Sequence, residues 1–270
     1  MDQPRHFPDR DRLNVLAAVI MLAFALSRFV QLPVQVWSVQ LPGLYLTIQI
    51  NVYTIVALLV AGLTASGADW LLRDHPALKE RNTFQHWLLP ALTAWVVGIP
   101  LFQLPLGFIW WIVFVIGGAL LMAVLVAEYI VVDPHDLRQP PAMAGLTAVS
   151  YALYLVLAIV LRASGVRLFL ILPALVFAAW LVSLRTLNLR LRGVWRISEC
   201  GVIALIAGQL IAAFHYWSLS PVSYGLVILG PTYALTSLIG SLVEGESARP
   251  ALLPSLLTIL VTWGIAFWLR

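Results

Sequence analysis

Long apolar segments dominate this sequence and constrain its fold more than any other feature. Nine of them, each about 17–24 residues long, are separated by short polar linkers. A helix of about 20 apolar residues crosses the hydrocarbon layer of a bilayer, which is about 30 Å thick. Because lipid offers no hydrogen bonds to an exposed backbone, segments of this length are expected to be helical. The pattern therefore predicts an all-α integral membrane protein with about nine transmembrane helices. The predicted spans are residues 14–33, 44–66, 87–106, 109–132, 143–161, 168–184, 199–217, 222–243 and 251–269.

The composition excludes a soluble globular protein. Hydrophobic residues make up 61% of the 270 and charged residues 10%, whereas a soluble domain carries about 25% charged residues. The linkers are too short for a soluble domain, so residues 1–270 are predicted to form a single polytopic transmembrane domain in the lipid bilayer. The net charge of +4 does not indicate nucleic acid as a partner, because the basic residues lie at the ends of the apolar segments. Cys200 is the only cysteine, which excludes an intramolecular disulfide.

The first apolar segment has to be distinguished from a cleavable signal peptide. Three arginines precede it, and Ala23-Phe24-Ala25 resembles a cleavage site. However, three aspartates are interspersed with those arginines, and the apolar run continues beyond Ala25. We therefore expect a first membrane span over residues 14–33.

The positions of the basic residues predict the orientation in the membrane, because cytoplasmic segments are enriched in Lys and Arg. With a cytoplasmic N-terminus, twelve of the 16 basic residues fall on the cytoplasmic side: Arg5, Arg10, Arg12, Arg73, Lys79, Arg81, Arg138, Arg185, Arg190, Arg192, Arg196 and Arg249. Arg28 lies within the first predicted span. We therefore predict a multi-pass protein of the cytoplasmic (plasma) membrane, with its N-terminus in the cytoplasm and its C-terminus outside.

A recurring proline motif suggests an internal repeat. Leu-Pro-Ala-Leu or Leu-Pro-Ser-Leu occurs around Pro90, Pro173 and Pro254, and each copy is followed by a tryptophan within the same span. Three helices per unit would invert each unit relative to the one before, as in many transporters. The alternative is a chance match, since a proline near the start of a span is easily accommodated. The repeat interpretation divides the chain into units of about 14–106, 109–184 and 199–269.

Glu128 is the only acidic residue in the interior of a predicted span, since Glu199 stands at the first position of its span. A carboxylate at the bilayer centre costs about 2.5–3.5 kcal/mol, so such residues are often functional. Glu128 lies about 7.5 Å along the helix before Asp133, close to the cytoplasmic boundary. There it could reach water or form a structural pair with Arg185 or Arg196, and both the structural and the functional alternative stay open.

A polar cluster follows Glu128 in the sequence and supplies the other candidate residues. The candidate catalytic residues are Glu128, Asp133, His135 and Asp136, and weak candidate metal ligands are His75, His135 and Asp136. No spacing places two metal ligands on one helical face, so we expect neither a metal nor another cofactor. The alternative is a solvated loop opened by the Asp133-Pro134 turn.

Four arginines after the sixth predicted span are expected to lie in the headgroup layer. A basic residue near an anionic membrane surface contributes about 1 kcal/mol of attraction. They therefore predict either a contact with anionic lipid headgroups on the cytoplasmic side or a simple topology anchor. These residues are Arg185, Arg190, Arg192 and Arg196.

The predicted spans contain few polar residues, which favours a non-catalytic membrane scaffold or accessory subunit. Its partners would be other membrane subunits. The alternative is an enzyme that acts on a lipid-linked or isoprenoid substrate at the cytoplasmic face. A small-solute transporter is less favoured, because ionisable groups near the midplane are missing. Gly230-Pro231 is expected to kink the eighth span and to free backbone carbonyls, either for packing or for a substrate site.

Overall fold

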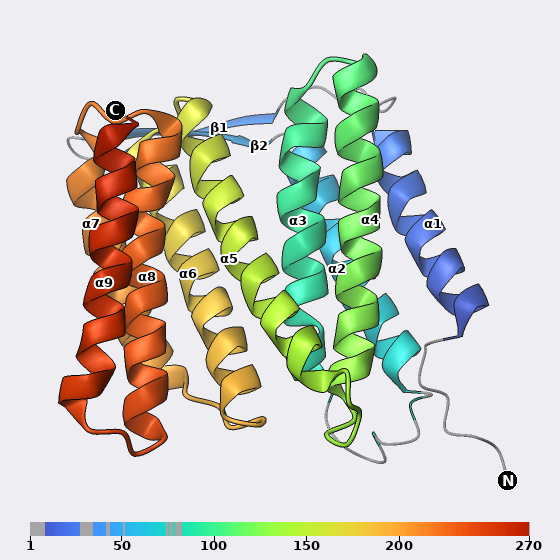
Figure 1. Ribbon diagram of the computed structural model, residues 1–270. Helices are drawn as coiled ribbons and strands as arrows, with labels where there is room; N and C mark the ends of the chain where they lie inside the picture. Colours follow the sequence, from blue (N-terminus) through green and yellow to red (C-terminus); the bar gives the residue numbers. More distant parts are fainter. Residues whose placement is uncertain are drawn as a thin grey trace, which may run out of the picture. The chain divides into compact units, whose positions relative to one another are not determined.

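The computed structural model of the chain describes residues 9–27, 35–41, 44–50, 52–73, 75, 78 and 83–269. The chain forms two compact units, unit 1 over Met1–Asp136 and unit 2 over Leu137–Arg270. Within each unit the long helices lie side by side, and successive helices run in opposite directions (Figure 1).

In its described residues, unit 1 has four long helices, a short 3-10 turn and a pair of antiparallel strands. The elements are α1 (Arg10–Ser27), β1 (Gln35–Leu41), β2 (Leu44–Ile50), α2 (Val52–Leu72), η1 (Phe84–His86), α3 (Leu88–Gln103) and α4 (Phe108–Val131). Apolar side chains of the four helices form one core, in which Ile20, Val60, Leu101 and Leu121 are almost fully buried. Gly118 of α4 lets α1 approach closely, because a Cβ atom at this position would press against Met21.

Unit 2 is a five-helix bundle built around one central helix. Its elements are α5 (Gln139–Ala163), α6 (Leu168–Arg190), α7 (Ile197–His215), α8 (Pro221–Val243) and α9 (Ala248–Trp268). Helix α8 packs against each of the other four. Tyr224, Val227 and Ile228 on α8 are completely buried, whereas most of α9 is exposed and apolar, as expected of a helix that faces lipid.

Eight helices of the described residues are long and apolar enough to cross a membrane. This confirms that the long apolar segments are mainly helical, and the eight apolar helices suggest a multi-pass membrane protein. The ninth long helix, α1, begins with Arg10, Asp11 and Arg12, and the apolar part that follows is only roughly 22 Å long. Residues 28–33 of the predicted first span, including Arg28, lie outside the described residues.

The predicted second span is wrong in its first part. Residues 44–50 form strand β2, which pairs antiparallel with β1 so that Trp37 lies opposite Ile48. The sequence of this segment alternates apolar and polar residue types around Pro42-Gly43, which is the pattern of a hairpin. Because these residues continue directly into an apolar run, they resemble the beginning of a span. Helix α2 begins only at Val52 and continues to Leu72.

Charged side chains of the described residues gather mainly at one end of each unit. In unit 1 this end holds the start of α1, the end of α2, the start of α3 and the end of α4. In unit 2 it holds the start of α5, the end of α6, the start of α7, the end of α8 and the start of α9, with Arg162 and Arg167 at the opposite end. We call it the charged end of each unit.

Candidate functional site

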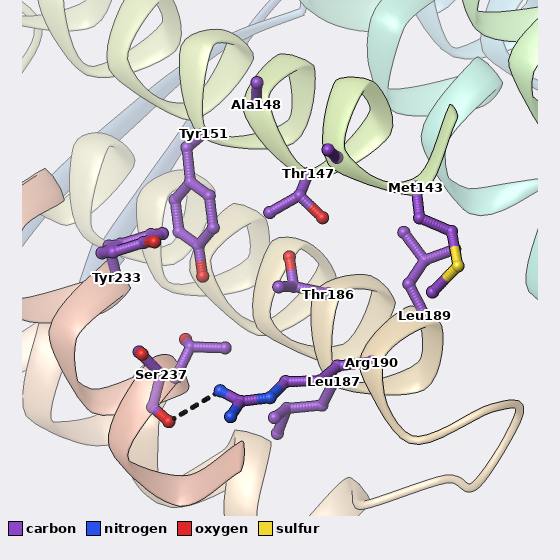
Figure 2. A pocket seen from close by; sticks show the side chains of 12 residues that line it. Met143, Thr147, Ala148, Tyr151, Thr186, Leu187, Leu189, Arg190, Tyr233 and Ser237 are labelled. Atoms are coloured by element: carbon purple, nitrogen blue, oxygen red, sulfur yellow. Dashed lines mark hydrogen bonds between the residues drawn. The ribbon is translucent and has the colours of Figure 1, made fainter. Parts of the chain in front are cut away.

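A pocket opens in unit 2 among α5, α6 and α8, and Figure 2 shows the side chains that line it. Its volume is about 520 Å³, within the range of typical small-molecule sites. The lining residues come from the first half of α5, the last turns of α6 and the second half of α8, so the pocket lies toward the charged end of unit 2. They are Met143, Ala144, Thr147, Ala148, Tyr151, Thr186, Leu187, Leu189, Arg190, Tyr233, Thr236 and Ser237.

Two hydroxyl groups of the pocket, those of Tyr151 and Thr186, lie beside each other, and that of Tyr151 also lies beside Thr236, but neither makes a hydrogen bond of good geometry among the described residues. The side chain of Tyr151 is 6% exposed, and neither its hydroxyl nor that of Thr186 is paired within the described structure. In Figure 2 both hydroxyls point into the space between α5 and α6. The Tyr151 ring is held edge-on by Tyr233, with ring centroids 5.0 Å apart. The pocket thus presents fixed but unused hydrogen-bonding groups.

Arg190 at the end of α6 is the one charged residue among the described residues that line the pocket, and its guanidinium is engaged by α8. Nε donates to Oε1 of Glu244 at 3.0 Å, and Nη2 donates to Oε2 of the same carboxylate at 2.6 Å. Nη1 donates to the backbone oxygen of Ser237, and Nη2 also donates to Ser241 Oγ. Gly240 makes this packing possible, because a Cβ atom there would collide with the guanidinium. The charge of Arg190 is therefore balanced within the protein.

Glu128, the candidate acid of the sequence, lies buried in unit 1. Its Oε2 is 2.7 Å from Nδ1 of His86, and the two side chains are 1% and 3% exposed. The 3-10 turn η1 places His86 at the charged end, opposite the last turns of α4. Nε2 of His86 lies 3.1 Å from Nε2 of Gln85. The sequence did not indicate His86 as a partner, since 42 residues separate it from Glu128 and no motif links them.

His75 and Asp69 belong to the same end of unit 1. The imidazole of His75 packs edge-on against Tyr129, with ring centroids 4.4 Å apart. Burial lowers the pKa of His75 below its ordinary value of 6.5; the weaker influences are Asp133, which raises it, His86, which lowers it, and Asp136, which raises it. Asp69 accepts a hydrogen bond from Thr83 and pairs with Arg73 at 2.7 Å. This end is a polar network between α2, η1 and α4.

The other candidate residues after α4 form a turn. The backbone N–H of His135 donates to Oδ1 of Asp133 at 2.9 Å, which confirms the expected turn at Asp133-Pro134. His135 is exposed and Asp136 is half-buried. No three His, Cys, Asp or Glu side chains of the described residues lie close enough together to hold a metal ion. His75, His135 and Asp136 are thus not assembled into a metal site.

The four arginines expected at the headgroups differ in their surroundings. Helix α6 continues to Arg190, so the predicted linker beginning at Arg185 is wrong in its first half. Arg185 is 2% exposed and donates to Asn188, whereas Arg192 is exposed. Arg192 adopts a left-handed conformation, with φ of 54°, at the end of α6. Arg196 pairs with Glu199 at 3.1 Å.

Several polar side chains donate hydrogen bonds to backbone carbonyls that lie at helix ends or at a break within a helix. Pro231 has no N–H to donate to Val227 in α8, and the indole of Trp263 on α9 donates to that carbonyl instead, at 3.1 Å. Arg162 donates to the backbone oxygens of His215 and Trp217 at the end of α7. The break at Gly230-Pro231 is therefore part of the packing between α8 and α9.

The chain belongs to a family whose description is "Protein of unknown function (DUF5656)", because residues 32–269 match the model of that family. No curated protein and no solved structure matches the chain.

Proposed function

We propose that this DUF5656 protein is a non-catalytic membrane scaffold or accessory subunit. The observation that carries the proposal is how the polar side chains within the helices are used. Thr64, Thr93, Ser150 and Thr232 each donate to the carbonyl four residues earlier in their own helix. Such bonds satisfy a buried hydroxyl without presenting it to a substrate.

The bonds between helices support the same role. Ser183 and Thr236 join α6 to α8 at 3.1 Å, and the indole of Trp263 joins α9 to α8. In unit 1 the indole of Trp110 donates to the carbonyl of Leu101 at 2.9 Å and ties α4 to α3. Polar groups that hold helices in place build a rigid frame, which is what a scaffold needs.

An enzyme acting on a lipid-linked or isoprenoid substrate at the cytoplasmic face is the second candidate. The observation in its favour is the short contact between His86 and Glu128, since an imidazole oriented by a carboxylate is a common general base. Asp133 and His135 lie in the turn after α4, so they could approach a headgroup. Against catalysis, both His86 and Glu128 are almost fully buried.

The proposal includes a membrane arrangement. The charged ends of the units would face the cytoplasm, with the N-terminus inside and the C-terminus outside. In this arrangement the exposed Arg192 is the best candidate for contact with anionic lipid headgroups, followed by Arg196 and Arg190, which already have carboxylate partners.

Gentle detergent extraction followed by mass spectrometry of the co-purifying proteins tests the scaffold role. We expect one or more membrane proteins at a constant ratio to this chain, with the same ratio in the Glu128→Gln and His135→Ala variants. Glu244→Gln, which alters a carboxylate of unit 2, is the matched control. Recovery of the chain without any protein in constant ratio would refute the scaffold, and an altered lipid profile in Glu128→Gln alone would support the enzyme.

A further inference from the structure

We propose that the pocket between α5, α6 and α8 binds a neutral amphiphile with a head of hydroxyl or carbonyl groups, of the monoacylglycerol or diacylglycerol type. This inference stands on the pocket in unit 2 and does not rest on the scaffold role. It follows from three properties of the lining: unused hydroxyls, balanced charge and an apolar wall.

The unused hydroxyls show that the pocket is built for a polar partner. Tyr151 is more than nine-tenths buried, lines the pocket, and has no hydrogen-bond partner for its hydroxyl among the described residues. Thr186 adds a second unpaired hydroxyl from the facing helix α6. The hydroxyl of Tyr151 lies beside those of Thr186 and Thr236, but none of these contacts reaches good hydrogen-bond geometry. Buried polar groups in proteins are nearly always well paired, so this cluster of hydroxyls in one cavity points to a ligand that completes their hydrogen bonds.

The balance of charge selects a neutral ligand. Glu244 binds the guanidinium of Arg190 through two of its nitrogens, at 2.6–3.0 Å, and Ser237 and Ser241 accept its other donated hydrogen bonds. An anionic head would have to displace Glu244 from Arg190 and would leave that carboxylate without its cation. Hydroxyl and carbonyl groups instead exchange neutral hydrogen bonds with Tyr151 and Thr186.

The apolar wall and the position of the pocket select an amphiphile. Met143, Ala148, Leu187 and Leu189 supply an apolar lining beside the hydroxyls. The pocket lies toward the charged end of unit 2, where the proposed arrangement puts the headgroup layer. A cavity of about 520 Å³ accommodates a small polar head and the first carbons of a chain, while the rest of the chain extends into lipid.

Titration of the full-length protein, measured by native mass spectrometry, tests the proposal with monodecanoylglycerol as the probe. Glycerol and decanoic acid are the comparison probes for a soluble polyol and for an anionic amphiphile. We expect saturable binding of one monodecanoylglycerol, weaker binding of decanoic acid and no binding of glycerol. Glycerol binding as tight as that of the ester, tighter binding of decanoic acid, or no saturable binding of the ester would each overturn the proposal.

Three variants locate the binding. Tyr151→Phe and Thr186→Val each remove one unpaired hydroxyl while keeping the shape of the side chain, and each is expected to weaken binding roughly tenfold. Tyr154→Phe is the matched control, because Tyr154 is a second buried tyrosine of α5 whose hydroxyl also lacks a partner among the described residues but which does not line the pocket. Both tyrosine hydroxyls lie beside threonine hydroxyls of neighbouring helices, so the control also matches any loss of stability. Equal affinities for wild type, Tyr151→Phe and Thr186→Val would refute the site.

Discussion

Glu128 and His86 show how a single buried carboxyl constrains its neighbourhood. A carboxyl that is 1% exposed needs a partner within hydrogen-bonding distance, and His86 provides one at 2.7 Å. We therefore expect His86→Ala to destabilise the protein by about 3 kcal/mol, because breaking a buried pair leaves a desolvated carboxyl without this partner. Unfolding by SDS in mixed micelles measures the change in the free energy of unfolding.

Two further variants separate this effect from general damage. Arg73→Ala breaks the contact with Asp69, where the arginine side chain is 71% exposed, and is expected to cost less than about 1 kcal/mol. Adding Glu128→Gln to His86→Ala removes the buried carboxylate and is expected to recover part of the lost stability. An effect of His86→Ala no larger than that of Arg73→Ala would contradict the structural importance of the pair.

His75 makes the stability of unit 1 depend on pH. Because burial lowers its pKa from the ordinary 6.5, the unfolded chain takes up a proton at a higher pH than the folded protein. The contribution of His75 is therefore fully present above pH 6.5 and is lost as the pH falls through the lower pKa of the folded state. Asp133, Asp136 and His86 are the titratable groups that act on it.

We expect His75→Phe to reduce the loss of stability between about pH 7.5 and about pH 5.5, since phenylalanine keeps the ring contact with Tyr129 and cannot be protonated. Melting temperatures of both proteins at the two pH values measure this difference. His135→Gln is the control, because His135 is exposed, and it should follow the wild type. An unchanged pH dependence in His75→Phe would show that other groups are responsible.

Helices α8 and α9 are in close contact at Gly230. A Cβ atom at this position would overlap the hydroxyl of Thr262 on α9. We therefore expect Gly230→Ala to destabilise unit 2 by about 1–3 kcal/mol through overpacking. Gly264→Ala on α9 is the matched control, since nothing lies within 4 Å of its Cβ position, and it should be neutral or stabilising by up to about 1 kcal/mol.

The double variant Gly230→Ala with Thr262→Ala checks the cause, again by SDS unfolding. Removing the hydroxyl of Thr262 takes away the atom nearest to the new methyl group, whereas the Cβ of residue 262 stays close to it, so part of the lost stability should return. A double variant as unstable as Gly230→Ala alone would locate the damage elsewhere in α8, for example at Pro231.

At the scale of helices and strands, the sequence predicted the long helices, because their apolar segments have the length of a membrane span. It missed the strands and the last turns of α6, because these depend on contacts with other segments. Seven predicted spans correspond to helices α3–α9, because an apolar run of about 20 residues has few alternatives. The hairpin at residues 35–50 was missed, since its alternating segment adjoins the apolar run of α2. The extension of α6 to Arg190 was missed because Arg185 and Arg190 have the charge typical of a linker, although α6 and α8 give both side chains partners.

The candidate site was predictable only in part, because the partners of its side chains come from segments that are distant in the sequence. Glu128 stood out as the one acid in the interior of a predicted span, but its partner depends on where η1 places His86. The pocket residues Tyr151 and Thr186 are ordinary residues of membrane helices, and only the tertiary structure shows that their hydroxyls are unpaired. The three-unit repeat stays a prediction.

For the whole molecule, the asymmetry of charge within each unit is the feature that a topology experiment can test. Leu137 begins unit 2 at its charged end and is 95% exposed, whereas Tyr216 follows α7 at the opposite end and is 82% exposed. Gly107, which is also exposed, marks the uncharged end of unit 1 between α3 and α4. Each position reports on one side of the membrane without disturbing a core.

Single cysteines at these positions, in a Cys200→Ala background, should react differently with a membrane-impermeant maleimide. We expect Tyr216→Cys and Gly107→Cys to be labelled in intact cells, and Leu137→Cys only after permeabilisation, because basic residues are retained on the cytoplasmic side. The Cys200→Ala parent, which has no cysteine, is the control for background labelling. Labelling of Leu137→Cys in intact cells would show that unit 2 has the opposite orientation to the one proposed. Labelling of Tyr216→Cys without Gly107→Cys would mean that the two units do not share one orientation, in which case the number of membrane crossings before α3 would have to be revised.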